Sequence, residues 1–100
     1  MLETRQTAQF AKWMRTLPAV AARKVAIRIA RLESGLMGDV QPVGDGISEL
    51  RVHFGPGYRV YFTRIGASIF LLLVGGDKSS QSRDIARAKE MARMLKKEPS

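Results

Sequence analysis

The chain has 100 residues, of which 45% are hydrophobic, so one globular domain spanning residues 1–100 is expected rather than a disordered chain. No apolar run approaches the roughly 20 residues that a membrane-spanning helix needs, and residues 1–10 lack the apolar segment of a signal peptide. We therefore expect a cytoplasmic protein with no membrane partner. The absence of cysteine excludes disulfides and thiolate chemistry. No metal and no cofactor are predicted.

The chain is strongly basic, with 17 Lys and Arg against 9 Asp and Glu and a net charge of +8. The excess lies on the flanks, because residues 1–40 and 78–100 carry +4 each whereas residues 41–77 are neutral. A small domain of this charge is a candidate for binding nucleic acid or another polyanion. Basic helices often present only a solvated face, so charge alone leaves both interpretations open.

The first 40 residues predict a short edge strand and then two helices. The strand is expected within residues 2–6. The first helix, over residues 7–17, has an apolar stripe at helical spacing and is stopped by Pro18. This stripe consists of Phe10, Trp13, Met14 and Leu17. The second helix, over residues 19–36, carries the stripe Ala22, Val25, Ile29 and Leu32. We expect the two helices to form a hairpin with Trp13 in the core.

Residues 48–78 predict a meander of three antiparallel strands. Turn residues at 55–57 and 66 divide this stretch into pieces of strand length. The third strand, residues 69–74, is apolar on both faces and is therefore expected to be the central one. Residues 38–46, which precede the meander, have the composition of a surface loop.

The first two strands of the meander carry polar residues on one face, because side chains two apart point the same way. A three-residue loop at 55–57 would set the register of this hairpin. The expected neighbours are then Phe54 with Tyr58, His53 with Arg59, and Arg51 with Tyr61. The resulting polar patch consists of Glu49, Arg51, His53, Arg59 and Tyr61.

A basic helix is predicted to end the chain. The preceding turn, residues 75–84, is rich in Gly and Ser and offers side chains that cap a helix. The buried stripe of the helix is expected to be Ile85, Ala88, Ala92 and Leu95. Residues 98–100 are expected to fray. The predicted class is α+β: two N-terminal helices packed on a small antiparallel sheet, made of the meander and an N-terminal edge strand, with a basic C-terminal helix.

This order of elements, together with four short segments, resembles the RelE/ParE toxin superfamily and most closely its HigB-like, phage-related branch of addiction module killer proteins. The segments are SELR at 48–51, GPGYRVYF at 55–62, GGDKS at 75–79 and RDI at 83–85. The resemblance implies a RelE-like fold and the toxin of a type II toxin–antitoxin pair. It also implies a partner antitoxin, of the helix-turn-helix, HigA-like type.

The resemblance leaves the target open. The RelE and HigB branches cut mRNA in the ribosomal A site, whereas the ParE branch has the same fold and poisons DNA gyrase. We expect a ribosome-dependent, metal-independent endoribonuclease that binds the ribosome and mRNA and inhibits translation. The alternatives are a non-catalytic gyrase inhibitor and a decayed toxin that retains only antitoxin binding.

The residues suggest how RNA cleavage would proceed. A 2′-hydroxyl must lose a proton, a phosphorane-like transition state must be stabilised, and the leaving 5′-oxygen must gain a proton. The resemblance implies that Arg59, Lys78 and Arg51 are the cations that hold the scissile phosphate. Glu49 and His53 are the candidates for proton transfer. Each also has a structural interpretation, Glu49 as a salt-bridge partner and His53 as an ordinary surface residue.

The chain departs from the family near the start of its last helix, where several relatives carry a tyrosine or histidine and this chain has Arg83, Asp84 and Ile85. Asp84 is therefore a further candidate for proton transfer. Tyr61 is a candidate for stacking on a base, with cross-strand packing as its alternative role. Three basic residues of the last helix are expected to hold RNA phosphates or to attract an acidic antitoxin segment: Arg83, Arg87 and Lys89.

Overall fold

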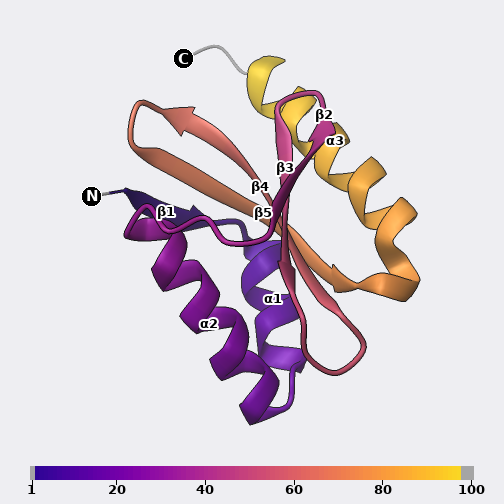
Figure 1. Ribbon diagram of the computed structural model, residues 1–100. Coiled ribbons are helices and arrows are strands. Elements are labelled where there is room, and N and C mark those ends of the chain that lie inside the picture. Colours follow the sequence, from indigo (N-terminus) through magenta and orange to yellow (C-terminus); the bar gives the residue numbers. More distant parts are fainter. Residues whose placement is uncertain (1, 98–100) are drawn as a thin grey trace.

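The computed structural model describes residues 2–97, which form a five-stranded sheet with helices on both faces (Figure 1). The elements in chain order are β1 (Glu3–Gln6), α1 (Ala8–Thr16), α2 (Ala19–Glu33), β2 (Val40–Gly44), β3 (Ile47–Val52), β4 (Tyr58–Gly66), β5 (Ile69–Asp77), the 3-10 helix η1 (Lys78–Ser80) and α3 (Gln81–Lys97). The expected fraying at 98–100 lies outside the described residues. None of the described helices is long and apolar enough to cross a membrane.

The sheet has the strand order β1-β5-β4-β3-β2. The predicted N-terminal edge strand is confirmed as β1, which pairs with β5 in parallel, whereas the other neighbours are antiparallel. The expectation that β5 is central is wrong, because β4 is the middle strand. The sequence had correctly indicated cover on both faces of β5, since it lies between β1 and β4 and contacts α1 and α3.

The prediction of a surface loop over residues 38–46 is wrong, because this segment contains the edge strand β2. Its positive-φ residues lie at the two ends of β2, with Gly38 at 67° before the strand and Gly44, Asp45 and Gly46 at 97°, 57° and 77° at the connection with β3. Pro42 lies in β2 with an exposed side chain, and proline is tolerated on an edge strand because it lacks only a donor. The glycine and proline content of this segment therefore predicted a loop where the structure has a strand.

The hairpin between β3 and β4 has a longer loop than expected. Val52 pairs with Tyr58, so the loop comprises residues 53–57, and Arg51 lies opposite Arg59. The predicted register is wrong by two residues. A shift of two leaves every side chain on its expected face, so the polar face of the hairpin is the one that the sequence indicated.

Each face of the sheet carries its own hydrophobic cluster. The cluster under α1 and α2 contains Phe10, Val25, Leu32, Leu50, Val52, Val60, Phe62, Phe70 and Leu72. The cluster under α3 contains Ile47, Tyr61, Leu73, Val74, Ala88 and Ala92. The predicted helical stripes are confirmed at most positions, but Ala21 is buried in place of Ala22, and Leu95 is 44% exposed.

A β-bulge in β5 determines which residues meet α3. Tyr61 pairs with Val74 and Phe62 pairs with Leu72, so Leu73 is an extra residue in β5. Leu72 therefore packs toward α1 and α2, whereas Leu73 and Val74 both pack toward α3. Further along β5, Gly75 lies against the ring of Trp13 on one face and Gly76 against Asp84 on the other.

Gly75 is expected to be required for the packing of α1, because a Cβ at this position would overlap the Trp13 ring. Gly75→Ala should lower the free energy of unfolding by about 1–3 kcal/mol, as overpacking does in other cores. Gly66→Ala is the matched control, since its Cβ would lie 3.6 Å from the nearest Ile69 atom and should change stability by less than about 0.5 kcal/mol. Urea unfolding measures both, and equal losses would contradict the close packing of Trp13 on Gly75.

Candidate functional site

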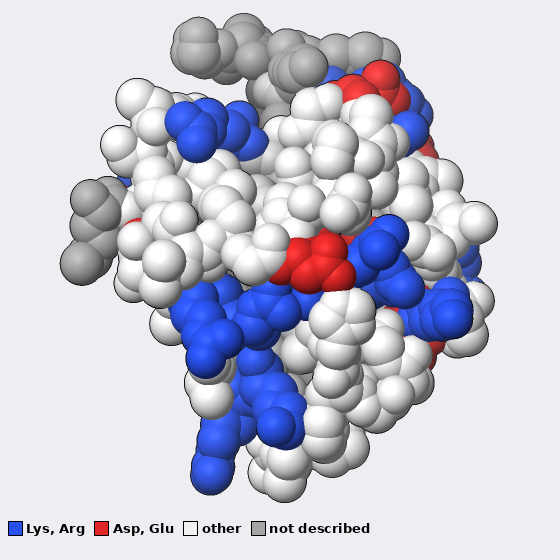
Figure 2. Space-filling model, viewed as in Figure 1, with Lys and Arg blue, Asp and Glu red and all other residues white. Residues whose placement is uncertain are grey.

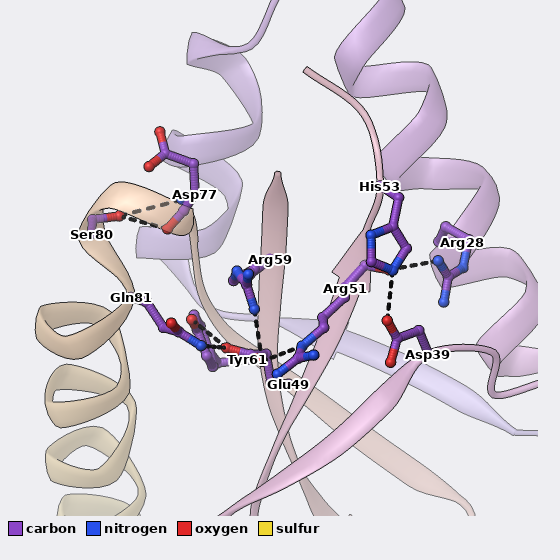
Figure 3. A network of polar contacts seen from close by, with 10 residues as sticks. All are labelled: Arg28, Asp39, Glu49, Arg51, His53, Arg59, Tyr61, Asp77, Ser80 and Gln81. Carbon is purple, nitrogen blue, oxygen red and sulfur yellow. Dashed lines mark hydrogen bonds and ion pairs between the residues drawn. The ribbon is translucent and has the colours of Figure 1, made fainter. Parts of the chain in front are cut away.

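The polar face of the hairpin is organised around Glu49, which lies on β3 and is fully buried at 0% exposure. Its Oε1 accepts hydrogen bonds from Arg51 Nε at 2.9 Å and Arg59 Nη1 at 3.0 Å. Its Oε2 accepts from the Tyr61 hydroxyl at 2.9 Å and Gln81 Nε2 at 2.8 Å (Figure 3). We call these five residues the Glu49 cluster. The cluster joins β3, β4 and the first residue of α3.

The Glu49 cluster holds a fixed pattern of charge. Burial alone would raise the pKa of Glu49, but the hydrogen bonds from Arg51, Gln81 and Tyr61 and the charge of Arg59 outweigh it, so this pKa lies below its ordinary value. Burial and the hydrogen bond to Glu49 raise the pKa of Tyr61. The carboxylate therefore stays ionised and the phenol stays protonated at neutral pH.

The two arginines of the cluster differ in their exposure. The side chain of Arg51 is 36% exposed and that of Arg59 is 12% exposed. Arg59 Nε is buried and has no hydrogen-bond partner among the described residues. A substrate at this surface can therefore reach Arg51 directly and a small part of Arg59, whereas Glu49 is covered by its own donors.

Lys78 lies at the same end of the sheet as the cluster although it comes from a different element. Arg51, Arg59 and Gly76 occupy facing positions on β3, β4 and β5, and Lys78 follows at the start of η1 with an exposed side chain. Asp77 fixes this turn, because its side chain accepts a hydrogen bond from Ser79 N at 2.8 Å. The three predicted phosphate-binding cations thus lie at one end of the sheet.

His53 does not join the cluster, so the expectation that it lies beside Arg59 is wrong. It falls in the loop after β3, is 74% exposed, and its Nε2 lies 2.6 Å from Asp39 Oδ2. This hydrogen bond lowers the pKa of Asp39. The hairpin loop is longer than the sequence suggested, and this carries His53 away from β4 and toward the start of β2.

Tyr61 and Asp84 are both buried. Tyr61 is 0% exposed, so it cannot stack on a base and takes its alternative role of packing within the sheet. Asp84 is 5% exposed, and its Oδ2 accepts a hydrogen bond from Ser80 Oγ at 2.5 Å. Only glycine fits at position 76, because a Cβ there would overlap the Asp84 carboxylate.

The predicted RNA-binding residues of α3 lie in different places. Arg83 and Arg87 are exposed and line one pocket together with residues of α1. Lys89 is only 28% exposed, and its Nζ lies 3.8 Å from Asp45 Oδ2 in the turn between β2 and β3. It is therefore separated from the other two. Figure 2 shows that further Lys and Arg side chains gather along α2.

Sequence reasoning grouped Glu49, Arg51, Arg59 and Tyr61 correctly but missed Gln81. The period of two was sufficient for the four strand residues. Gln81 could be identified only by knowing where α3 begins. The turn before it contains several serines that could each cap the helix, so the sequence did not define its first residue. The described residues contain no group of three or more His, Asp or Glu side chains placed to hold a metal ion.

Comparison with known proteins places the chain in a family. Residues 12–97 match the family described as phage-derived protein Gp49-like (DUF891). The chain is 42% identical over 95 residues to a Haemophilus influenzae (strain Rd) protein described as uncharacterized, and the match covers 94% of this chain and 96% of that protein.

The fold is similar to that of a solved structure. A chain in the crystal structure of the intact E. coli RelBE toxin–antitoxin complex superposes with a TM-score of 0.65 at 10% identity, covering 77% of this chain and 96% of that chain. This similarity confirms the predicted RelE-like fold, and the family match is independent of it. The chain belongs to the phage-derived Gp49-like family.

Proposed function

We propose that this protein is the toxin of a type II toxin–antitoxin pair and that it cleaves mRNA on the ribosome, in the cytoplasm. The observation that carries the proposal is the Glu49 cluster, which fixes two arginines at the end of the sheet beside the exposed Lys78. The RelE-like fold and the Gp49-like family support the same assignment. RelBE is a toxin–antitoxin complex. By analogy, the partner of this protein is an antitoxin, and we propose one of helix-turn-helix type.

The proposed reaction is attack of a 2′-oxygen on the neighbouring phosphorus, with breakage of the bond to the 5′-oxygen. The 2′-hydroxyl loses its proton to a base and the 5′-oxygen takes one up, so the products are a 2′,3′-cyclic phosphate and a 5′-hydroxyl. Negative charge grows on the phosphate oxygens in the transition state, and fixed cations stabilise it most when they need not reorganise. Arg51 and Lys78 are exposed and contact these oxygens directly, whereas Arg59 adds its charge from beneath. Arginine presents a planar fork of donors that suits phosphate.

Glu49 acts in this proposal as a positioning residue. Both of its oxygens are engaged by donors and it is fully buried, so it orients the two guanidinium groups. Asp84 is likewise buried and engaged by Ser80. Among the predicted proton-transfer residues, solvent reaches His53 most freely, and a role for it in moving a proton remains a prediction.

Removing the exposed cations should reduce toxicity. Arg51→Ala and Lys78→Ala should each lower the rate of mRNA cleavage by about 10²-fold, as expected when one donor to a developing oxyanion is removed. Arg64→Ala is the matched control, because Arg64 lies toward the other end of β4 and bonds the Ala67 carbonyl. Growth after induction and the mapping of new mRNA 5′ ends measure the effect.

The same mapping distinguishes the alternatives. New ends within codons that disappear when initiation is blocked would support ribosome-dependent cleavage. Growth arrest without such ends, accompanied by loss of supercoiling, would contradict the proposal in favour of a gyrase inhibitor. No arrest with a folded wild-type protein would favour a decayed toxin that retains antitoxin binding.

The positioning role of Glu49 predicts a pH-dependent stability. Glu49→Gln leaves the largely buried Arg59 without its anion and should lower the free energy of unfolding by about 2–4 kcal/mol near neutral pH. The pKa of Glu49 is lower in the folded chain than its ordinary 4.5, so this contribution is present above that pH and is lost as pH falls through the folded pKa.

Urea unfolding of wild type and Glu49→Gln over a series of decreasing pH values tests this point. The difference between the two proteins should shrink in acid, because protonation of wild-type Glu49 removes the charge that the variant lacks. A difference that stays constant below the ordinary pKa of a glutamate would contradict the role of Glu49 as the anion of the cluster.

A further inference from the structure

A pocket of about 490 Å³ lies between α1, the end of β5 and the start of α3. Its walls include Trp13 from α1 and Arg83 and Arg87 from α3, and its floor includes Gly75 and Gly76. The volume is within the range of small-ligand sites, roughly 300–1,000 Å³. The pocket lies outside the Glu49 cluster.

The fold opens this pocket where β1 leaves the sheet. β1 pairs with β5 only as far as Leu72, and Thr7 then donates to the Leu73 carbonyl at 2.6 Å and caps α1. Beyond this point β1 no longer covers the edge of β5. Gly75 and Gly76 lie along this uncovered edge, with the Trp13 ring against Gly75 and Asp84 over Gly76, and all four residues line the pocket.

The pocket has more basic than acidic groups in its lining, with three cations and two carboxylates. Lys12, Arg83 and Arg87 line it, and none of them forms an ion pair with a described residue. The two carboxylates each accept a hydrogen bond, and Asp77 also interacts with the charge of Arg83. Asp77 Oδ1 accepts from Ser79 N at 2.8 Å and Asp84 Oδ2 from Ser80 Oγ at 2.5 Å.

Trp13 gives the pocket an aromatic wall while it packs on the hydrophobic cluster under α1 and α2, as the sequence predicted. Its ring packs against Phe10 and Tyr58 at centroid distances of 5.7 and 6.2 Å, but the residue is only partly buried. Its indole N–H donates to no described residue. Cations beside an accessible aromatic surface are the features with which proteins bind single-stranded RNA.

We propose that this pocket binds a nucleotide of the RNA that flanks the cleaved one, with its base against Trp13 and its phosphate between Lys12 and Arg87. The inference rests on the proposed function. Its geometric basis is that the pocket and the Glu49 cluster are neighbours: Gly76, in the pocket lining, pairs with Arg59, and Gln81, at the start of α3, contacts Glu49. The turn at η1 thus separates the pocket from the Glu49 cluster, and one RNA strand can contact both sides of the turn. The aromatic wall favours RNA over an acidic peptide.

Trp13 is the single tryptophan of the chain, so its fluorescence reports directly on the pocket. The probe is a short 2′-O-methyl oligoribonucleotide, which cannot be cleaved because its attacking hydroxyl is blocked. We expect saturable quenching with the full chain. The double variant Lys12→Ala/Arg87→Ala should weaken the apparent affinity about tenfold or more and should reduce the salt dependence by about one phosphate contact.

The matched control is Arg15→Ala/Arg93→Ala, which removes the same charge from the same two helices at exposed positions outside the pocket. It should change the affinity by less than about threefold, since only long-range charge is lost. Equal weakening by both double variants would overturn the inference, because it would show diffuse attraction. Quenching by a polyglutamate peptide but not by the oligonucleotide would overturn it in favour of an acidic protein partner.

Cleavage in cells separates this inference from the proposed function. Normal mRNA cleavage by Lys12→Ala/Arg87→Ala, with no quenching of the wild type, would overturn the pocket alone. Saturable quenching that depends on Lys12 and Arg87, in a wild type that produces no new mRNA ends, would support RNA binding in the pocket and overturn cleavage instead.

Discussion

A buried carboxylate controls the arrangement of this end of the molecule. Taking Glu49 out of water is unfavourable unless its oxygens are fully hydrogen-bonded, and four donors from β3, β4 and α3 meet that requirement. Since these donors come from three elements, the start of α3 cannot move without leaving the carboxylate unsatisfied. The position of η1, and with it Lys78, depends on this constraint.

The glycines at the end of β5 work together with that constraint. The bulge at Leu73 turns Gly75 toward α1 and Gly76 toward α3, so both helices approach the strand more closely than any side chain would allow. Asp84 then fits over Gly76 and accepts from Ser80, which fixes the first turn of α3. β1 has stopped pairing with β5 before this point, so the pocket beside Trp13 lies along an edge that no strand covers.

How far the sequence predicted this structure depended on the kind of signal. Periodicity was sufficient for α1, α2 and the faces of β3 and β4, because it reports directly on which side chains are buried. It did not reveal β2, whose glycine and proline content resembles a loop. Hairpin register depends on loop length, and no residue within 53–57 marks where pairing ends. The predicted position of His53 was wrong for that reason. Arg51 and Arg59 still lie on the predicted face of the sheet, because a shift of two residues does not change the face.

The bulge in β5 and the burial of Glu49 had no sequence signal at all. A continuous run of leucine and valine has the same pattern whether or not it contains a bulge. The sequence therefore could not show which side chains of β5 face α3. Glu49 was correctly grouped with its arginines. The local sequence pattern is the same, however, whether the glutamate lies on an exposed face of the sheet or beneath a helix. Its burial depends on α3, and the first residue of that helix, Gln81, supplies the last donor.

The Glu49 cluster is better explained by orientation than by stability. An apolar cluster of the same volume generally stabilises a fold as well as a buried ion network does, or better. The network differs from an apolar cluster in holding the guanidinium groups of Arg51 and Arg59 in one orientation while leaving part of Arg51 in solvent. Positive charge that is already oriented requires no reorganisation when an anion arrives. A buried glutamate that is covered by its own donors can therefore serve a phosphate site without ever touching the phosphate.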